Sequence, residues 1–289
     1  MKDRSVSAVL TAQTIDMEGI AVKQAFPTQK IENIDPFLLL HHVKTVIPNY
    51  INPVKAGFAP HPHRGFSPVT FVFEGGVHHR DSRGNNSIIY EGGVQWMNSG
   101  MGIMHSERPP HDIQNFGGKQ ELVQLWINTP RAHKMDQPQY FPIASAEIPF
   151  IKSDDELIEV KIVAGELSGI KGSIQHITPI NAYVIKAEKN GKMQLELPSN
   201  HNAFLYLLNG QLRIAGLGLV DAETAIKFNN DGKVITIEAI KDLRAIIMTG
   251  EPINEPIVAH GPFVMNYEGE ILEAMRDYRM GKMGILIED

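Results

Sequence analysis

The chain contains no cysteine and only two tryptophans among its 289 residues, and aromatic residues make up just 7% of it. The absence of cysteine excludes disulfides, thiolate metal sites and thiol nucleophiles, and it fits a reducing compartment. Basic residues are also in the minority, 27 against 33 acidic ones, which gives a formal net charge of −6. This balance argues against direct binding of nucleic acid by the chain as a whole.

Long apolar runs are missing as well. None approaches the roughly 18 residues that a membrane span requires, and residues 1–19 lack the continuous apolar core of a signal peptide. We therefore expect no membrane contact and a cytoplasmic location, or a nuclear one if the organism is a eukaryote.

Helical periodicity is scarce in this sequence. Short apolar or alternating runs recur instead, separated by Gly, Asn, Asp and Pro. Residues 69–73 end at Glu74-Gly75-Gly76, and residues 203–208 end at Asn209-Gly210. This spacing is typical of a β sandwich or barrel. We predict an all-β fold of two antiparallel β-barrel domains, residues 1–135 and 136–289, joined through a proline-rich stretch around residues 130–155.

One helix is predicted at the C-terminal end, from Glu268 to Met280, with Asn266 as its N-cap. Its apolar side chains fall near one face: Ile271, Leu272, Met275 and Tyr278. A helix packed on its own barrel is the simpler interpretation, and a partner-binding helix is the alternative.

Two short histidine clusters are the most informative feature of the chain. His61-Pro62-His63 and His105-Ser106-Glu107 supply three imidazoles and one carboxylate. Because alternate residues of a strand point to the same face, two paired strands would bring these four groups together. Such a set suits Fe(II), Mn, Cu, Ni or Zn and leaves positions open for substrate or dioxygen. The alternative, surface histidines and a salt-bridging glutamate, leaves the glycines and apolar residues around both clusters unexplained.

The other histidines support weaker predictions. His78-His79 follows a strand and is expected in an exposed hairpin, with an accessory metal or substrate role as the alternative. His41-His42 follows an apolar run and is expected to be structural. In the second half of the chain, His201 lacks a second imidazole at ligand spacing, so we expect that barrel to bind no metal.

Several longer segments resemble the pirin family, a branch of the cupin superfamily of small metal-holding β barrels. They are HPHRGF, FEGG, QWMNSGMGIMHSERP, QLWIN and GEPINEPIVAHGPFVMNYEGEI, and the resemblance covers nearly the whole chain. It implies a bicupin whose N-terminal barrel binds metal through His61, His63, His105 and Glu107, and whose C-terminal barrel has lost its site. It also places His41-His42 near the pocket, which one of them could line.

One position departs from the family pattern. Most cupins have a glutamate shortly after the histidine pair, where this chain has Ser67. The resemblance implies that the carboxylate ligand comes from the second cluster, so Ser67 is not expected to abolish metal binding. It could alter the hydrogen bonds around the ligands, which tune their basicity.

The resemblance implies a metal-dependent dioxygenase, an oxidoreductase that opens a flavonol such as quercetin and releases carbon monoxide. One divalent ion, Fe(II) before Mn, Cu, Ni or Zn, would anchor the flavonol, and Glu107 would act as the catalytic base. No organic cofactor is implied. The alternative is an iron-containing, redox-responsive protein that binds a transcription factor or a metabolic enzyme.

Overall fold

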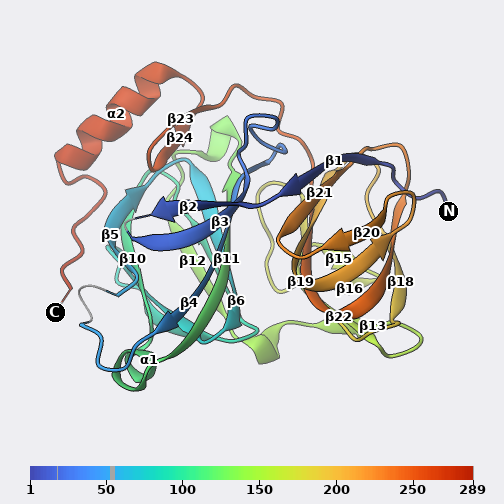
Figure 1. Cartoon of the computed structure of the whole chain (residues 1–289). Helices are drawn as coiled ribbons and strands as arrows, with labels where there is room; N and C mark the ends of the chain where they lie inside the picture. The colour runs from blue at the N-terminus through green and yellow to red at the C-terminus, as the bar shows by residue number, and fades with distance from the viewer. Residues whose placement is uncertain (18, 53–55, 289) are drawn as a thin grey trace. The chain divides into compact units, whose positions relative to one another are not determined.

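Strands make up most of the computed structural model, which describes residues 1–17, 19–52 and 56–288 (Figure 1). The chain forms two compact units. The first contains Met1–Ile15, Lys23–Leu39 and Ala146–Pro252, and the second contains Asp16–Val22, Leu40–Ser145 and the segment from Ile253 to the C-terminus. Each unit draws on separated stretches of chain, so the continuous domains 1–135 and 136–289 stay a prediction.

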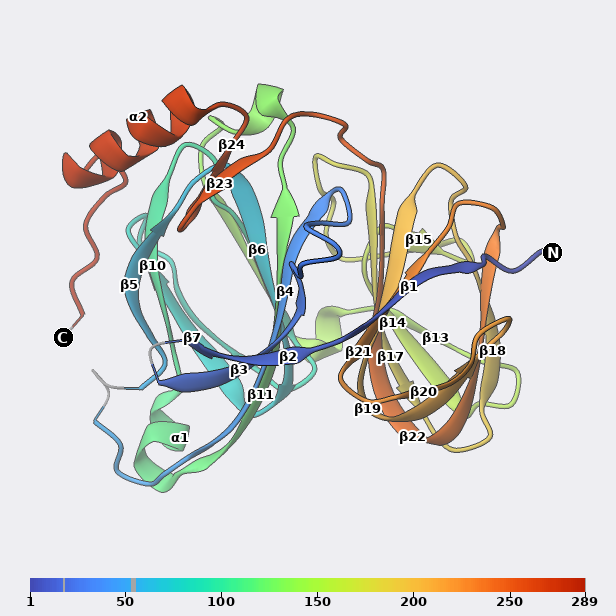
Figure 2. The ribbon, with the colours of Figure 1, turned by 45° about the horizontal axis from the view of Figure 1, so that its top comes forward.

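Two antiparallel sheets build the second unit, and they face each other in both ribbon views (Figure 1, Figure 2). The smaller has the order β5-β10-β7-β8, and the larger has the order β12-β9-β6-β11-β4-β3-β2. The strands of the smaller sheet are β5 (Phe58–His63), β7 (Gly76–Asp81), β8 (Asn86–Tyr90) and β10 (Ile103–Arg108). Those of the larger are β2 (Gln13–Met17), β3 (Ile20–Phe26), β4 (Phe37–Ile47), β6 (Phe66–Glu74), β9 (Val94–Asn98), β11 (Gly118–Asn128) and β12 (Gln139–Ile143).

The interior of this unit is apolar and aromatic. Strand β6 is buried along nearly its whole length, because β9 and β11 flank it and side chains on both of its faces are covered. Phe66, Phe71 and Trp96 are at most 1% exposed. Burying such side chains supplies most of the driving force for closing the barrel, and it gives β5 and β10 a rigid support.

A nine-stranded sheet dominates the first unit, in which β18 and β20 pair beside the main order β1-β21-β19-β22-β17-β14-β13. The long β22 pairs with β18 along its first residues and with β17 along its last, so it joins these two strands into one sheet. The strands are β1 (Val6–Thr11), β13 (Phe150–Lys152), β14 (Ile158–Ala164), β17 (Ile180–Ala187), β18 (Lys192–Glu196), β19 (Asn202–Ile214), β20 (Gly218–Asp221), β21 (Thr224–Phe228) and β22 (Val234–Gly250), with the hairpin β15 (Glu166–Leu167) and β16 (Ile170–Lys171) beside them.

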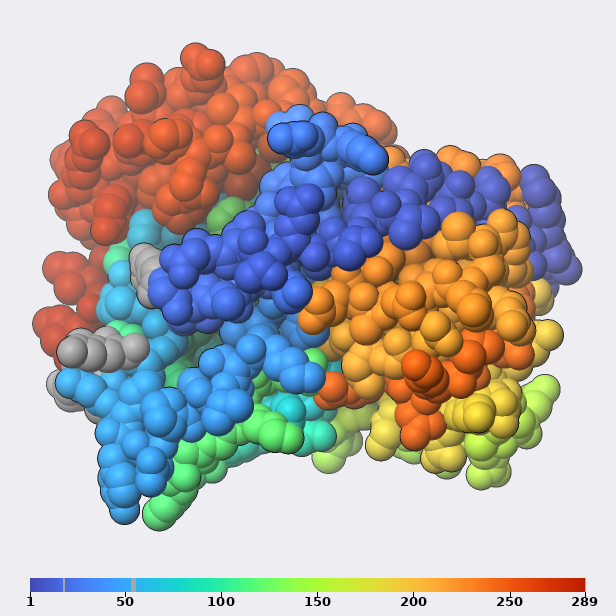
Figure 3. Space-filling model, in the orientation of Figure 1, coloured from blue at the N-terminus to red at the C-terminus, as the bar shows by residue number. Residues whose placement is uncertain are grey.

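The C-terminal helix is α2 (Glu268–Arg279), and it packs on the hairpin of β23 (Val258–His260) and β24 (Phe263–Met265). In the space-filling view it lies on the surface of its unit (Figure 3). The predicted N-cap Asn266 is wrong by one residue. Tyr267 is the N-cap, and the Glu270 carboxylate accepts its backbone N–H at 3.1 Å, which forms half of a capping box.

The predicted apolar face of α2 is only partly correct. Ile271 and Ala274 are buried against Phe263, but Leu272 is 67% exposed and Tyr278 is 42% exposed. The packed stripe is narrow because the hairpin beneath the helix has only short strands. A second helix, α1 (His111–Phe116), was not predicted, since six residues are too few to show a helical period.

The prediction of an all-β fold with two antiparallel barrels and a C-terminal helix is confirmed. Two 3-10 turns, Arg131–His133 and Ser145–Glu147, lie in the proline-rich stretch between the barrels. Neither α-helix in the described part of the chain has the length and apolar character needed to cross a membrane.

Candidate metal centre

Three of the four predicted ligands meet where β5 pairs with β10. His61 lies directly opposite His105 in the antiparallel ladder, and His63 is two residues further along β5 on the same face. Their ring centroids are 4.3 to 4.9 Å apart. One nitrogen from each ring lies within 4.8 Å of the other two, so this group could hold a metal ion.

Hydrogen bonds fix which ring nitrogen each histidine offers. Nδ1 of His61 lies 2.8 Å from the Ala59 carbonyl oxygen, and Nδ1 of His63 lies 3.4 Å from that of Pro262. Among the described residues, the buried Nε2 atoms of His63 and His105 have no hydrogen-bond partner. A buried polar atom without a partner costs free energy, and a metal ion would satisfy both, so the donor set fits one.

The electrostatics also favour neutral rings. Burial, helped by the neighbouring His61, holds the pKa of His63 well below its usual range. Burial also lowers the pKa of His105, with smaller contributions from His61, His63 and His79. A ligating imidazole must be neutral, so the protein keeps these two rings in the state that binds metal.

Glu107 lies on the same strand but has other partners. The register of β10 against β5 shifts between His105 and Glu107, with the extra residue on β5, whereas β10 pairs regularly with β7 at both residues. Glu107 therefore points to the same face of β10 as His105, and it differs from His105 in its hydrogen-bond partners. Its Oε1 accepts hydrogen bonds from Thr70 and Gln95, and its Oε2 accepts one from Gln124 at 2.8 Å. Among the described residues, the group of converging ligand atoms does not include Glu107. Its role as a ligand stays a prediction.

Ser67 stands where the cupin pattern has glutamate. It is fully buried at the start of β6, and its hydroxyl donates to Asn98 Oδ1 at 2.8 Å. Aromatic rings also lie beside His63. The ring centroids of Phe66 and Trp126 are 5.0 and 5.3 Å from that of His63. These two aromatic neighbours of the site carried no signal in the sequence.

The prediction that His78-His79 lies in an exposed hairpin is correct in the hairpin, which β7 forms with β8, and wrong in the exposure. Both residues lie within β7, where His78 is 8% exposed and His79 is fully buried. The strand is covered because β8 and β10 flank it and the barrel interior closes over His79. His79 Nδ1 lies 3.5 Å from His105 Nδ1, so a residue expected at the surface contacts a candidate ligand.

His41 and His42 are buried in β4, as expected for structural residues. His42 lies 3.1 Å from the Glu121 carboxylate. Burial lowers the pKa of His41 to about 4, so that ring is neutral at ordinary pH.

The C-terminal segment of the chain contacts the first histidine cluster and the residue that follows it. The Pro262 carbonyl contacts His63. The next residue, Arg64, donates a hydrogen bond to the Met101 carbonyl at 2.6 Å and forms an ion pair with Asp277 of α2 at 3.1 Å. Arg64 and Asp277 are both buried. The loop after His63 is therefore held by residues roughly 200 positions away in sequence, a contact that no local pattern could predict.

Replacing Asp277 with asparagine is expected to lower the free energy of unfolding at pH 7 by roughly 1–3 kcal/mol, because Arg64 would stay buried without its counter-ion. Hydrogen bonds from Lys282 and then Arg64 lower the pKa of Asp277 to about 2 against the opposing effect of burial. An unfolded aspartate has a pKa of about 3.9. The wild-type advantage is therefore present above that value and is lost as the pH falls toward 2.

Thermal or urea unfolding at pH 7 and at low pH checks this prediction. Glu273→Gln is the matched control, since Glu273 also lies on α2 and bonds Arg276 but is exposed. Equal unfolding free energies for Asp277→Asn and the wild type at pH 7 would contradict the expected role of the buried pair.

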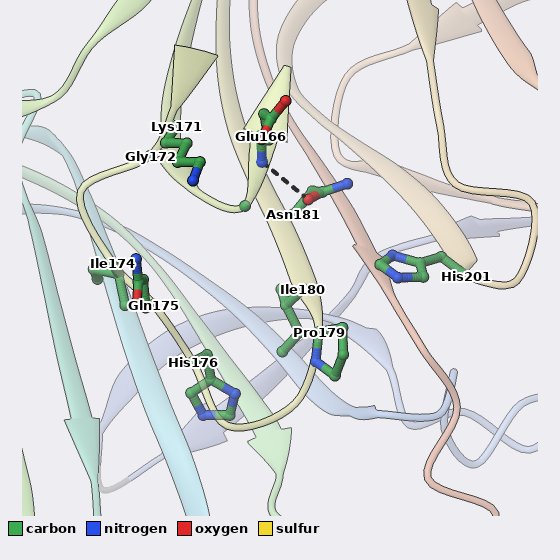
Figure 4. Close-up of a pocket in the computed structure, with 11 residues that line it drawn as sticks. Glu166, Lys171, Gly172, Ile174, Gln175, His176, Pro179, Ile180, Asn181 and His201 are labelled. Carbon is green, nitrogen blue, oxygen red and sulfur yellow. Dashed lines mark hydrogen bonds between the residues drawn. The ribbon is translucent and has the colours of Figure 1, made fainter. Parts of the chain in front are cut away.

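A separate cavity of about 330 Å³ lies in the first unit (Figure 4). Its lining includes Glu166, Lys171, Asn181, His176 and His201. His201 Nδ1 bonds the Thr249 hydroxyl at 3.0 Å, and burial lowers the pKa of His176 to about 4. The two rings come from different segments and lie apart in Figure 4, whereas the histidines of the second unit converge.

Both barrels match models of a known protein family. The Pirin family model matches residues 19–127, and the model of the Pirin C-terminal cupin domain matches residues 182–284. The chain belongs to the pirin family. Pirin-like protein 2 of Arabidopsis thaliana is 36% identical to this pirin over 92% of the chain and 81% of its own length. Human pirin is 33% identical over 96% of the chain and 92% of its own length.

A solved structure confirms the bicupin fold of this pirin. The crystal structure named quercetin 2,3-dioxygenase from Acinetobacter baumannii matches with a TM-score of 0.93 and 31% identity. The match covers 99% of this chain and 100% of that one. The chain is therefore a bicupin with a three-histidine group that could bind a metal ion.

Proposed function

We propose that this pirin is a metal-dependent dioxygenase that opens a flavonol such as quercetin, with Fe(II) held by His61, His63, His105 and Glu107. The proposal rests on one observation above all, the convergence of three imidazoles, two of which present buried Nε2 atoms without a hydrogen-bond partner in the described part of the chain. It is supported by the match over nearly the whole chain to a structure that bears the name quercetin 2,3-dioxygenase.

A divalent ion bound there would supply Lewis acidity and would orient the hydroxyl and carbonyl oxygens of the flavonol. The protein would supply the geometry, because two paired strands carry all three imidazoles and packing fixes their rings. Trp126 beside His63 is partly exposed and offers a flat apolar surface that suits an aromatic substrate, and the buried Phe66 packs against it.

Glu107 would take the proton of the substrate hydroxyl. Its Oε1 is engaged by Thr70 and Gln95, whereas its Oε2 accepts one hydrogen bond among the described residues, from Gln124. A carboxylate oxygen has two acceptor sites, so Oε2 retains one, which would hold the metal ion first and the substrate proton after the carboxylate leaves the ion. The Gln124 amide is itself oriented, since its Oε1 accepts the indole N–H of Trp126 at 3.2 Å.

The test is metal analysis of the purified protein combined with a quercetin assay. Protein stripped by a chelator and reloaded with Fe(II), Mn, Cu, Ni or Zn is mixed with quercetin without oxygen, and oxygen is then admitted. We expect loss of the flavonol absorbance and release of carbon monoxide only with metal and oxygen both present. Stoichiometric metal without turnover for any of the five ions would reject the flavonol dioxygenase and would favour a protein that binds a partner.

A further inference from the structure

A buried chain of side chains leads away from the candidate metal centre through His105. Strand β7 pairs with β10, and this pairing places Asp81 opposite His105 and His79 opposite Glu107. His79 Nδ1 lies 3.5 Å from His105 Nδ1, and His79 Nε2 lies 3.0 Å from Asp81 Oδ2. His79 is fully buried and Asp81 is 4% exposed.

Asp81 and His79, the two residues of this chain beyond His105, are each held by further contacts. Oδ1 of Asp81 accepts the backbone N–H groups of Arg83 and Asn85 at 2.9 and 3.1 Å, and Oδ2 accepts the Asn85 side-chain amide at 2.7 Å. The ring of Tyr140 stacks on His79, with centroids 3.9 Å apart and planes 7° from parallel. Burial acts to raise the pKa of Asp81, but these hydrogen bonds and the one from His79 outweigh it and lower the pKa.

With Asp81 ionised and His79 neutral, the hydrogen-bonding capacities allow one arrangement of protons. An ionised carboxylate only accepts, so Nε2 of His79 must carry the hydrogen that it shares with Asp81. Neutral His79 then has a lone pair at Nδ1, and Nδ1 of His105 must donate to it. The lone pair of His105 consequently lies on Nε2, the buried atom that has no partner among the described residues.

We propose that Asp81 and His79 are positioning residues that hold His105 in the ring orientation and tautomer that direct its Nε2 to the metal. This inference rests on the proposed metal centre. His61 and His63 are oriented by backbone carbonyls, those of Ala59 and Pro262. The orientation of His105 depends instead on side chains, so it can be altered by substitution while the backbone stays unchanged.

The first test is the affinity of the metal-free protein for Zn(II), measured by competition with a chromophoric chelator. His79→Leu is expected to bind Zn(II) roughly 10–100-fold more weakly than the wild type, the usual effect of removing a group that orients a ligand. His78→Leu is the matched control, because His78 is also a buried histidine of β7 but bonds Asn86 at 2.6 Å. Equal affinities for His79→Leu and His78→Leu would overturn the proposal.

A conservative variant separates orientation from packing. The side-chain oxygen of asparagine can take the place of His79 Nδ1 and accept from His105, so His79→Asn is expected to recover most of the lost affinity. It also keeps the test decisive if His79→Leu fails to fold, which circular dichroism would reveal. Affinity for His79→Asn as weak as for a folded His79→Leu would show that packing, and not the hydrogen bond, matters.

The second test reads the tautomer itself by long-range ¹H–¹⁵N spectra of the metal-free protein. Wild-type His105 is expected to carry its hydrogen on Nδ1, and in His79→Leu it is expected to shift toward Nε2. An unchanged tautomer in that variant would overturn the inference. This measurement needs no bound metal, so a failure of the wild type to bind Zn(II) would count against the proposed function and leave the tautomer result to be judged separately.

Discussion

His105→Ala is expected to reduce bound metal from stoichiometric to trace amounts and to abolish any oxygenase activity with it. The substitution removes one of three converging imidazoles and leaves Glu107, whose carboxylate already has three donors, as the remaining candidate ligand on β10. It also leaves His79 Nδ1 without the group it contacts. The loss of affinity should exceed the roughly 10–100-fold effect of altering an orienting residue. Elemental analysis and Zn(II) competition together measure it.

His61→Ala should behave in the same way, because His61 faces His105 directly across the ladder. His78→Ala serves as the control, since it removes a buried imidazole from β7 that is not part of the converging group. Stoichiometric metal in both His61→Ala and His105→Ala would show that the ligand assignment is wrong. A loss of affinity no greater than that of His79→Leu would show that His105 is not a direct ligand.

The convergence of the three histidines could be predicted because it depends on local rules. His61 and His63 are two residues apart on one strand, and the two-residue period of a strand puts both rings on one face. The turns that separate the strands are marked by Gly, Asn and Asp, so the all-β fold could also be predicted. The pairing of β5 with β10 does not follow from these local rules, although the intervening glycine-rich stretch allows it.

His79 could not be predicted from its local sequence, and the reason is burial. His78 to Asn85 is polar and contains a glycine, which is typical of an exposed hairpin. In the structure the turn comes only after Asp81, whose carboxylate binds the backbone at Arg83 and Asn85. The preceding residues stay in β7, where β8 and β10 cover them. The hairpin forms as predicted, but its polar strand is buried because the polar groups of that strand find hydrogen-bond partners within the unit.

The supports from the C-terminal segment are long-range contacts with no local signal. Pro262 is 199 residues from His63, and Asp277 is 213 residues from Arg64. Only the folded chain brings them together. Glu107 has a different reason for its separate partners, since Thr70, Gln95 and Gln124 donate hydrogen bonds to its carboxylate. Strand β10 runs regularly against β7 from His105 to Arg108, so the alternation of the strand gives no sign of these partners.

The hydrogen bonds of the Glu107 carboxylate give the second large prediction, which concerns Glu107→Gln. Glutamine has nearly the same size, but one of its terminal atoms donates. If its oxygen keeps the bonds from Thr70 and Gln95, its NH₂ group faces the amide of Gln124. Gln124 can turn its amide to accept, at the expense of the bond from Trp126. We expect a cost of roughly 1–3 kcal/mol in unfolding free energy and a folded protein.

If Glu107 acts as the base, turnover of quercetin by Glu107→Gln should fall roughly 10²–10⁴-fold, the usual contribution of a general base, while Zn(II) affinity falls much less. Glu121→Gln is the matched control, because Glu121 is an equally buried carboxylate of the same unit that bonds His42. It should lose stability and keep its turnover. Unchanged turnover in Glu107→Gln would reject the role of base. A parallel loss of metal and turnover would instead make Glu107 a ligand first, and would mean that the carboxylate leaves its glutamine partners to reach the ion.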